Sequence, residues 1–266
     1  MLSTVAPWDM VAEGYAKTTM RLFQGYVERA LELAELSEES CILDVACGPG
    51  TLALQAANLV SSVHAIDFSE AMIAILQAHI GSNKIGNIET TCGDGQDLPY
   101  EDDLFDVAFS MFGLMFFPDR KRGYSEIYRT LKPGGKILVS SWAPVSRSPA
   151  MQAMFGAVRA MKPEIPEPQT NMESLENPDF LKNELTNAGF RDIEVHSVTK
   201  TFPVISIETF WRDMLEGSAP ILMMKNSMQP SEWKEKEKIA LQHLESTITT
   251  VPSSLSSDAW FGYGIK

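Results

Sequence analysis

Two glycines beside an acidic strand form the segment of this chain that is most suggestive of chemistry. Gly48 and Gly50 follow a short apolar run that carries Asp44 and leads into Cys47. A side chain at either glycine would keep a ligand away from the backbone, and the sharp turn requires permissive backbone angles. The helix expected from Thr51 points its first N–H groups at the ligand and favours a carboxylate or phosphate. The segment predicts a binding turn for a nucleotide-like ligand.

The glycine turn alone leaves two cofactor classes open. Extended to Ala53, it also fits the dinucleotide fingerprint of NAD and FAD enzymes. The next expected strand, 63–67, ends in Asp67, whose carboxylate suits the ribose hydroxyls that both classes carry. An alternative for Asp67 is capping of the following helix, a position that Ser69 also fits.

Three further motifs lie at the ends of the later strands. Gly93-Asp94-Gly95 follows the third expected strand, Ser110 follows the fourth, and a glycine-rich reversal at 131–136 precedes the fifth. With the first two motifs these make five in register, and residues 40–142 resemble the class I S-adenosylmethionine (SAM)-dependent methyltransferases. The similarity is greatest to the small-molecule branch that contains the ubiquinone and menaquinone C-methyltransferases. The resemblance implies SAM as cofactor and S-adenosylhomocysteine (SAH) as product.

The same resemblance implies a role for each motif. The glycine turn would line the methionine and sulfonium part of SAM, Asp67 would hold the ribose, and Asp94 would accept from the adenine amino group. For Asp94, a plain turn residue is the alternative. Tyr15 lies in a segment similar to the family's lid, although its spacing from Trp8 also suits core aromatics. The residues so implied for the cofactor are Tyr15, Ala46, Gly48, Gly50, Asp67, Phe68, Met72, Asp94, Gly95 and Ser110.

An apolar space is expected for the methyl acceptor, beneath a cap at the carboxyl ends of the strands, since the methyl must face the acceptor in line with the departing sulfur. Ordinary core packing is the alternative for about half of the apolar candidates. Neither His196 nor His243 suits a catalytic base better than a structural position, so no catalytic residue is assigned. The four histidines lack metal-ligand spacing, so no metal is expected. The residues expected to contact the acceptor are Met115, Phe116, Trp142 and Trp211.

Strands and helices alternate over 41–141, which calls for a parallel sheet with right-handed crossovers. We expect an α/β, Rossmann-like fold whose seven-stranded sheet has six parallel strands and one antiparallel C-terminal strand. Helices cover both faces, and a helical cap is added. One domain is predicted over 1–266, with a loop-rich first insertion and two helices in the second. Its parts are an N-terminal helical lid at 1–36, a SAM-binding core at 37–142, and cap insertions at 143–178 and 201–255.

Composition narrows the partners and the compartment. The net charge of −13 argues against nucleic acid, and no apolar run is long enough to span a membrane. Cys41, Cys47 and Cys92 lie beside or within strands expected to be buried and form no C-x-x-C motif, which favours a cytoplasmic protein. The expected partner is a small-molecule methyl acceptor, and the oligomeric state is left open. The alternatives are a SAM-binding accessory or regulatory protein without turnover and, further off, an NAD-dependent oxidoreductase.

Overall fold

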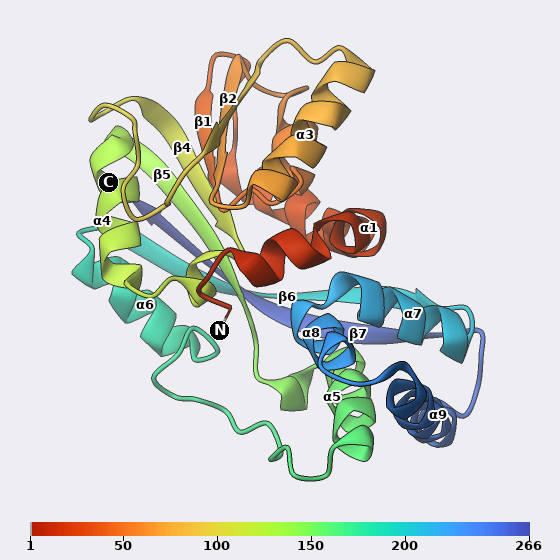
Figure 1. The fold of residues 1–266 in the computed structure, drawn as a ribbon. Coiled ribbons are helices and arrows are strands. Elements are labelled where there is room, and N and C mark those ends of the chain that lie inside the picture. Colours follow the sequence, from red (N-terminus) through yellow and green to blue (C-terminus); the bar gives the residue numbers. More distant parts are fainter. Residues whose placement is uncertain (1) are drawn as a thin grey trace.

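Seven strands form one sheet in the computed structural model, which describes residues 2–266 (Figure 1). The strand order is β3-β2-β1-β4-β5-β7-β6. Only β7 runs antiparallel to its neighbours β5 and β6, so the predicted sheet of six parallel strands and one antiparallel strand is confirmed. The strands are β1 Cys41–Val45, β2 Ser62–Asp67, β3 Ile88–Cys92, β4 Phe105–Met111, β5 Leu131–Trp142, β6 Arg191–Val204 and β7 Ser253–Ile265.

Helices cover both faces of this sheet. Ile42 and Leu43 are neighbours on β1 and are both fully buried, one in the core cluster under α1 to α3 and the other in the cluster under α4 and α6. Burial on both faces explains why β1 reads as a continuous apolar run interrupted only by Asp44. The helices are α1 Ala6–Ala34, α2 Thr51–Ala56, α3 Glu70–Asn83, α4 Arg120–Thr130, α5 Pro149–Met161, α6 Pro178–Asn187, α7 Ile207–Gly217, α8 Ala219–Asn226 and α9 Pro230–Thr247.

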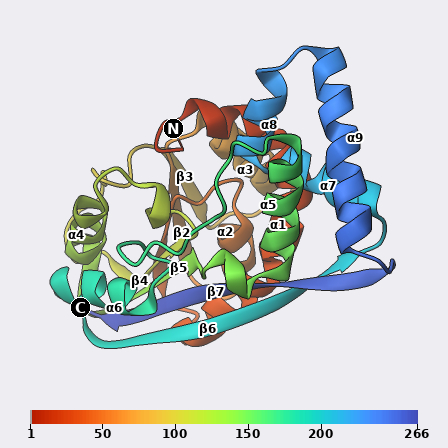
Figure 2. The same cartoon turned by 90° about the horizontal axis from the view of Figure 1, so that it is seen from below.

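Four helices gather at the far end of β6 and β7, and we call α5, α7, α8 and α9 the cap (Figures 1 and 2). The β6–β7 pair reaches Val204 and Ser253, beyond the point where β5 ends opposite Ala259. Within the cap, Trp211 stacks on Trp233 with ring centroids 6.3 Å apart. The second insertion therefore contains three helices, not the predicted two, and both flanking strands are longer than predicted.

The prediction of a loop-rich first insertion was wrong for residues 149–161, which form α5. Its buried residues Ala153, Ala157 and Met161 recur every four positions and pack in one cluster with the other cap helices. Pro149 occupies the first turn of the helix, where the missing N–H of proline costs nothing.

Helix α1 connects the sheet to the cap. It is a single helix of 29 residues that packs against α3 and α8 at one end through Val11 and Ala12. It crosses α7 where Gly14 faces the Glu216 carbonyl, so closely that an added Cβ would overlap that oxygen. Arg21 forms an ion pair with Asp213 of α7 at 3.1 Å. Helix α1 is thus in contact with both the core and the cap.

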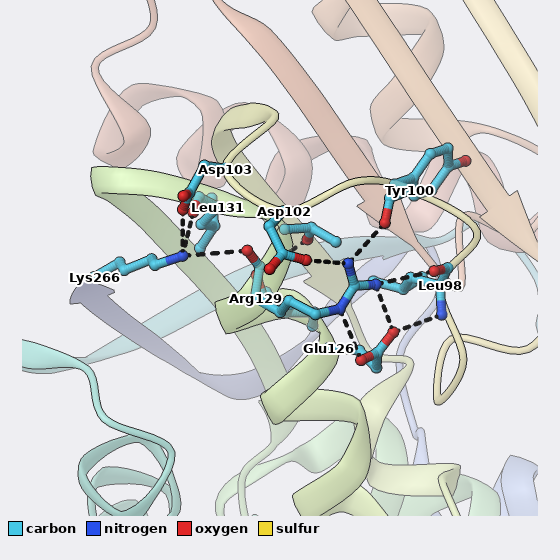
Figure 3. A network of polar contacts seen from close by, with 10 residues as sticks. Leu98, Tyr100, Asp102, Asp103, Glu126, Arg129, Leu131 and Lys266 are labelled. Atoms are coloured by element: carbon cyan, nitrogen blue, oxygen red, sulfur yellow. Dashed lines mark hydrogen bonds and ion pairs between the residues drawn. The ribbon is translucent and has the colours of Figure 1, made fainter.

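An arginine on α4 fixes the loop that follows β3 (Figure 3). The Arg129 guanidinium donates to both Glu126 oxygens, to Asp102 at 2.7 Å, and to the carbonyls of Tyr100 and Leu98. Glu126 in turn accepts the Leu98 N–H at 2.9 Å. The network holds the segment 98–102 against α4, directly after the turn that carries the predicted adenine-binding residues.

Candidate functional site

A cavity of ≈1250 Å³ lies between the carboxyl ends of β1, β2 and β4, helix α1, and the cap. One end is formed by the glycine turn and the acidic strand tips, and the other by apolar side chains of the cap. We call the first the cofactor end and the second the acceptor chamber. Of the residues predicted from the sequence, those that line it are Tyr15, Ala46, Gly48, Asp67, Phe68, Met72, Asp94, Gly95, Phe116 and Trp142.

The two glycines of the turn have different surroundings. Gly48 has φ +54° and no atom within 4 Å of the place where a Cβ would stand, so this side of the residue is open space. Gly50 has φ +91°, and a Cβ there would overlap the Leu76 side chain of α3. Gly48 lines the cavity, whereas Gly50 is a packing position that lets α2 approach α3.

The carboxylate of Asp67 joins the tip of β2 to the glycine turn. Its Oδ2 accepts the Gly48 N–H at 2.8 Å, and its Oδ1 accepts the Ser69 N–H at 2.9 Å. Burial raises the pKa of Asp67, while these two N–H groups oppose the rise. Ser69 is the N-cap of α3, because its Oγ accepts the Met72 N–H, so Asp67 is not the cap. A carboxylate has about four acceptor positions, which leaves capacity for ligand hydroxyls.

Asp44 is a further candidate beneath the same turn. It is 1% exposed, its Oδ2 has no hydrogen-bond partner among the described residues, and it lines a recess of ≈40 Å³ with Tyr15 and Gly48. Burial raises its pKa to about 7 against the lowering effect of the Ala53 N–H. Two buried carboxylates beside an open glycine fit a cationic ligand such as a sulfonium cofactor. The sequence signal was an acidic residue within an apolar strand just before the glycines.

Two strand ends turn sharply into the cavity. Ala46 after β1 has φ +57° and Phe112 after β4 has φ +58°, a conformation that is unusual for residues with a side chain. Phe112 lies 4.3 Å from Trp142 and 4.8 Å from Phe23 between ring centroids. These aromatic rings line the cavity, and we call them the aromatic wall.

Aromatic side chains of α1 cover the cofactor end. The Tyr15 ring meets Trp8 edge-on at 6.5 Å, and Trp8 meets Phe116 at 5.0 Å. Burial raises the pKa of the Tyr15 phenol, and the Asp67 charge adds to the rise, so Tyr15 is neutral at physiological pH. Asp94 faces the cavity from the turn after β3 and accepts the Gln96 backbone N–H at 2.9 Å.

Four residues predicted for the site lie elsewhere. Besides Gly50, the Ser110 side chain is fully buried and does not line the cavity, while the contact expected from its backbone stays a prediction; Met115 packs against both core clusters. Trp211 donates its Nε1–H to Glu237 at 3.0 Å inside the cap. From the cap, the acceptor chamber is lined instead by Met151, Met154, Phe155, Phe210 and Met214.

Other sequence expectations concern cysteines, metals and membranes. Cys92 is exposed at the end of the edge strand β3, none of whose residues is buried, so the expectation that each cysteine lies beside or within a buried strand was wrong for Cys92. Over residues 2–266, no three His, Cys, Asp or Glu side chains are grouped so that they could hold a metal ion. No helix in the same range is long and apolar enough to cross a bilayer.

The sheet order, the glycine turn after β1 and the acidic tip of β2 define a Rossmann-like fold of the methyltransferase type. A family model described as "Methyltransferase domain" matches residues 42–135. Demethylmenaquinone methyltransferase of Shouchella clausii is 32% identical over 171 residues, which cover 59% of this chain and 73% of that protein. A sterol 4-C-methyltransferase of Caenorhabditis elegans is 35% identical over 114 residues, which cover 41% of this chain and 33% of the relative.

The crystal structure of the YcgJ protein from Bacillus subtilis has the same fold, with a TM-score of 0.58 and 19% identity over 90% of this chain and 97% of that one. The chain belongs to the class I SAM-dependent methyltransferases, and SAM is its cofactor. The sequence resemblance is thereby confirmed at the level of the family.

Proposed function

We propose that this protein transfers the methyl group of SAM to a small apolar or aromatic acceptor held in the acceptor chamber. One observation carries the proposal: a single cavity joins the glycine turn at Gly48 to the apolar side chains of the cap. Donor and acceptor bound at its two ends would meet at the wall formed by Phe112 and Trp142.

In this proposal each part of the cofactor end holds one part of SAM. Gly48 and Ala46 lie along the methionine moiety, Asp67 accepts from the ribose hydroxyls, and Asp94 accepts from the adenine amino group. Phe68 and Met72 pack on the adenine faces. The domain assignment follows: 1–36 acts as lid, 37–142 holds SAM, and 143–178 with 201–255 shape the acceptor chamber.

SAM supplies an electrophilic methyl group on a sulfonium cation. The chain's own contribution is to orient the acceptor and exclude water. Trp8, Tyr15 and Phe116 cover the cofactor end, and the rings of Phe112 and Trp142 offer faces that suit a cation. Positioning is therefore the main catalytic contribution that we assign to the chain.

Two of the relatives support an apolar acceptor. The two named above carry the names of a quinone and a sterol methyltransferase, and both kinds of acceptor have apolar ring systems. The methionines of the acceptor chamber are adaptable in shape and favour a bulky apolar acceptor without selecting one.

Two measurements test the proposal. Calorimetric titration of the protein should show saturable binding of SAH and none of NADH. Incubation with methyl-labelled SAM and a library of quinones, phenols and apolar acids should then give a labelled product. Binding of NADH without SAH would point to an oxidoreductase. Binding of SAH without product from any acceptor would favour an accessory SAM-binding protein.

A further inference from the structure

The acceptor chamber contains an ammonium group that forms no ion pair with the residues that the structure describes. Two cations line the cavity within residues 2–266, Arg21 and Lys200, and the carboxylates of Asp213 and Glu28 line this part of it too. Arg21 pairs with Asp213 at 3.1 Å. The ammonium of Lys200 on β6 has no hydrogen-bond or ion-pair partner in the part of the chain that the structure describes.

The Lys200 side chain is placed by a glycine on α1. A Cβ added to Gly25 would lie 3.2 Å from Lys200 Cδ and 3.5 Å from its Nζ, so the stem and ammonium of the lysine lie directly against the bare backbone of α1. Gly25 itself lines the cavity beside Lys200. The absence of a side chain at Gly25 therefore makes room for the ammonium between β6 and α1.

The backbone of Lys200 is held from the same side. Ser257 is its partner on the neighbouring strand β7, and the Ser257 carbonyl accepts the Tyr26 hydroxyl at 2.7 Å. Phe202, two residues along β6, also lines the cavity, and its ring lies 6.2 Å from that of Tyr26. The ammonium is thus anchored next to the aromatic wall where donor and acceptor would meet.

We propose that the methyl acceptor is an amphipathic acid, whose anionic oxygen group pairs with Lys200 while its apolar body fills the acceptor chamber. This inference rests on the proposed function. An ammonium that faces an anion across an apolar wall gains more than it would in water, because the local dielectric constant is lower. The chain has a net charge of −13, which repels anions elsewhere on its surface. Lys200 therefore favours acids over neutral molecules of the same shape.

A pair of dyes with one ring system tests this inference on the full chain. 8-Anilinonaphthalene-1-sulfonate is anionic, and N-phenyl-1-naphthylamine has the same rings without the sulfonate. Both are titrated by fluorescence with saturating SAH present, so that the acceptor chamber is the part of the cavity left for them. Lys200→Met should weaken binding of the sulfonate dye by about tenfold to a hundredfold and leave the neutral dye unchanged.

Matched variants separate charge from shape. Lys200→Arg should retain the sulfonate dye, and Lys182→Met, which removes an exposed lysine of α6 outside the cavity, should bind both dyes like the wild type. Gly25→Ala displaces the lysine stem without a change of charge and should weaken the sulfonate dye alone. In the wild type, added salt should weaken the sulfonate dye and not the neutral one, a test that needs no variant to fold.

Three results would overturn the inference: equal sulfonate affinity in wild type and Lys200→Met, equal loss of both dyes in that variant, or no sulfonate binding to the wild type. Titration of SAH is carried out separately on every variant. If the wild type does not bind SAH, the proposed function is refuted. The dyes are then titrated without SAH, and they still decide whether Lys200 recognises an anion.

Discussion

The Asp67 carboxylate accepts the Gly48 backbone N–H at 2.8 Å, and this hydrogen bond joins the tip of β2 to the turn after β1. The residue proposed to hold the ribose therefore also fixes the backbone proposed to carry the methionine moiety. Changes at either residue are expected to affect the whole cofactor end.

Replacing Asp67 with alanine should reduce the affinity for SAH. The variant loses the acceptor for the ribose hydroxyls and for the Gly48 N–H, and we expect a loss of about 1–3 kcal/mol in calorimetry. Asp97→Ala is the matched control, because the Asp97 side chain is 79% exposed and pairs with Arg122 away from the cavity. Unchanged SAH affinity in a folded Asp67→Ala protein would contradict the ribose assignment.

The raised pKa of Asp44 should make stability depend on pH. With a pKa of about 7 in the folded state and an ordinary value when unfolded, Asp44 keeps its proton longer in the native protein. Its contribution to stability is complete below about pH 4 and is lost as the pH rises through about 7.

Asp44→Asn removes this titration while its amide oxygen can still accept the Ala53 N–H. We compare the free energies of unfolding of wild type and variant. The wild-type value minus the variant value should fall by roughly a few kcal/mol between about pH 4 and pH 8. Urea unfolding at several pH values measures this difference, and a constant difference would show that Asp44 is ionised throughout.

Alanine at the two turn glycines should have separable effects. Gly48→Ala places a methyl group in the cavity and should abolish most SAH binding, at a stability cost of about 1–2 kcal/mol for its left-handed backbone. Gly50→Ala adds a clash with Leu76 and should cost about 2–5 kcal/mol of stability, while the folded fraction keeps its affinity for SAH. Urea unfolding and SAH titration of both variants check this. Loss of SAH affinity in Gly50→Ala alone would show that Gly50, and not Gly48, is the cofactor-binding glycine.

Arg129→Lys should destabilise the fold by about 2 kcal/mol, because one ammonium cannot replace a guanidinium that contacts two carboxylates and two carbonyls. Arg122→Lys is the control, since Arg122 has one exposed partner and the change should cost less than about 1 kcal/mol. Urea unfolding midpoints compare the two variants. Equal midpoints would show that the network in Figure 3 adds little to stability.

The sequence predicted the sheet well because its signals are local. Continuous apolar runs such as β1, a glycine turn after the strand, and Ser69 as a helix cap each act within a few residues. The C-terminal strand was placed correctly because the resemblance to the methyltransferase family implies an antiparallel strand beside the sixth strand.

The cap and part of the site could not be predicted in the same way. Trp211 and Phe210 are adjacent and both apolar, yet one fills the cap interior and the other lines the cavity, and only the packing of α7 against α9 decides which. The sequence does not distinguish the packing role of Gly50 from the cavity-lining role of Gly48, because the difference depends on the position of Leu76. The environment of Lys200 depends on Gly25, which lies 175 residues earlier in the chain.

The crossing of α1 with α7 has a consequence for ligand exchange. Helix α1 carries Tyr15 at the proposed donor site and Gly25 beside the proposed acceptor site, and it is held against α7 by the close approach at Gly14 and the Arg21–Asp213 ion pair. We expect a displacement of this helix to uncover both ends of the cavity together, because it lines both of them. In the proposed function, release of the spent donor and departure of the methylated product are therefore expected to be linked.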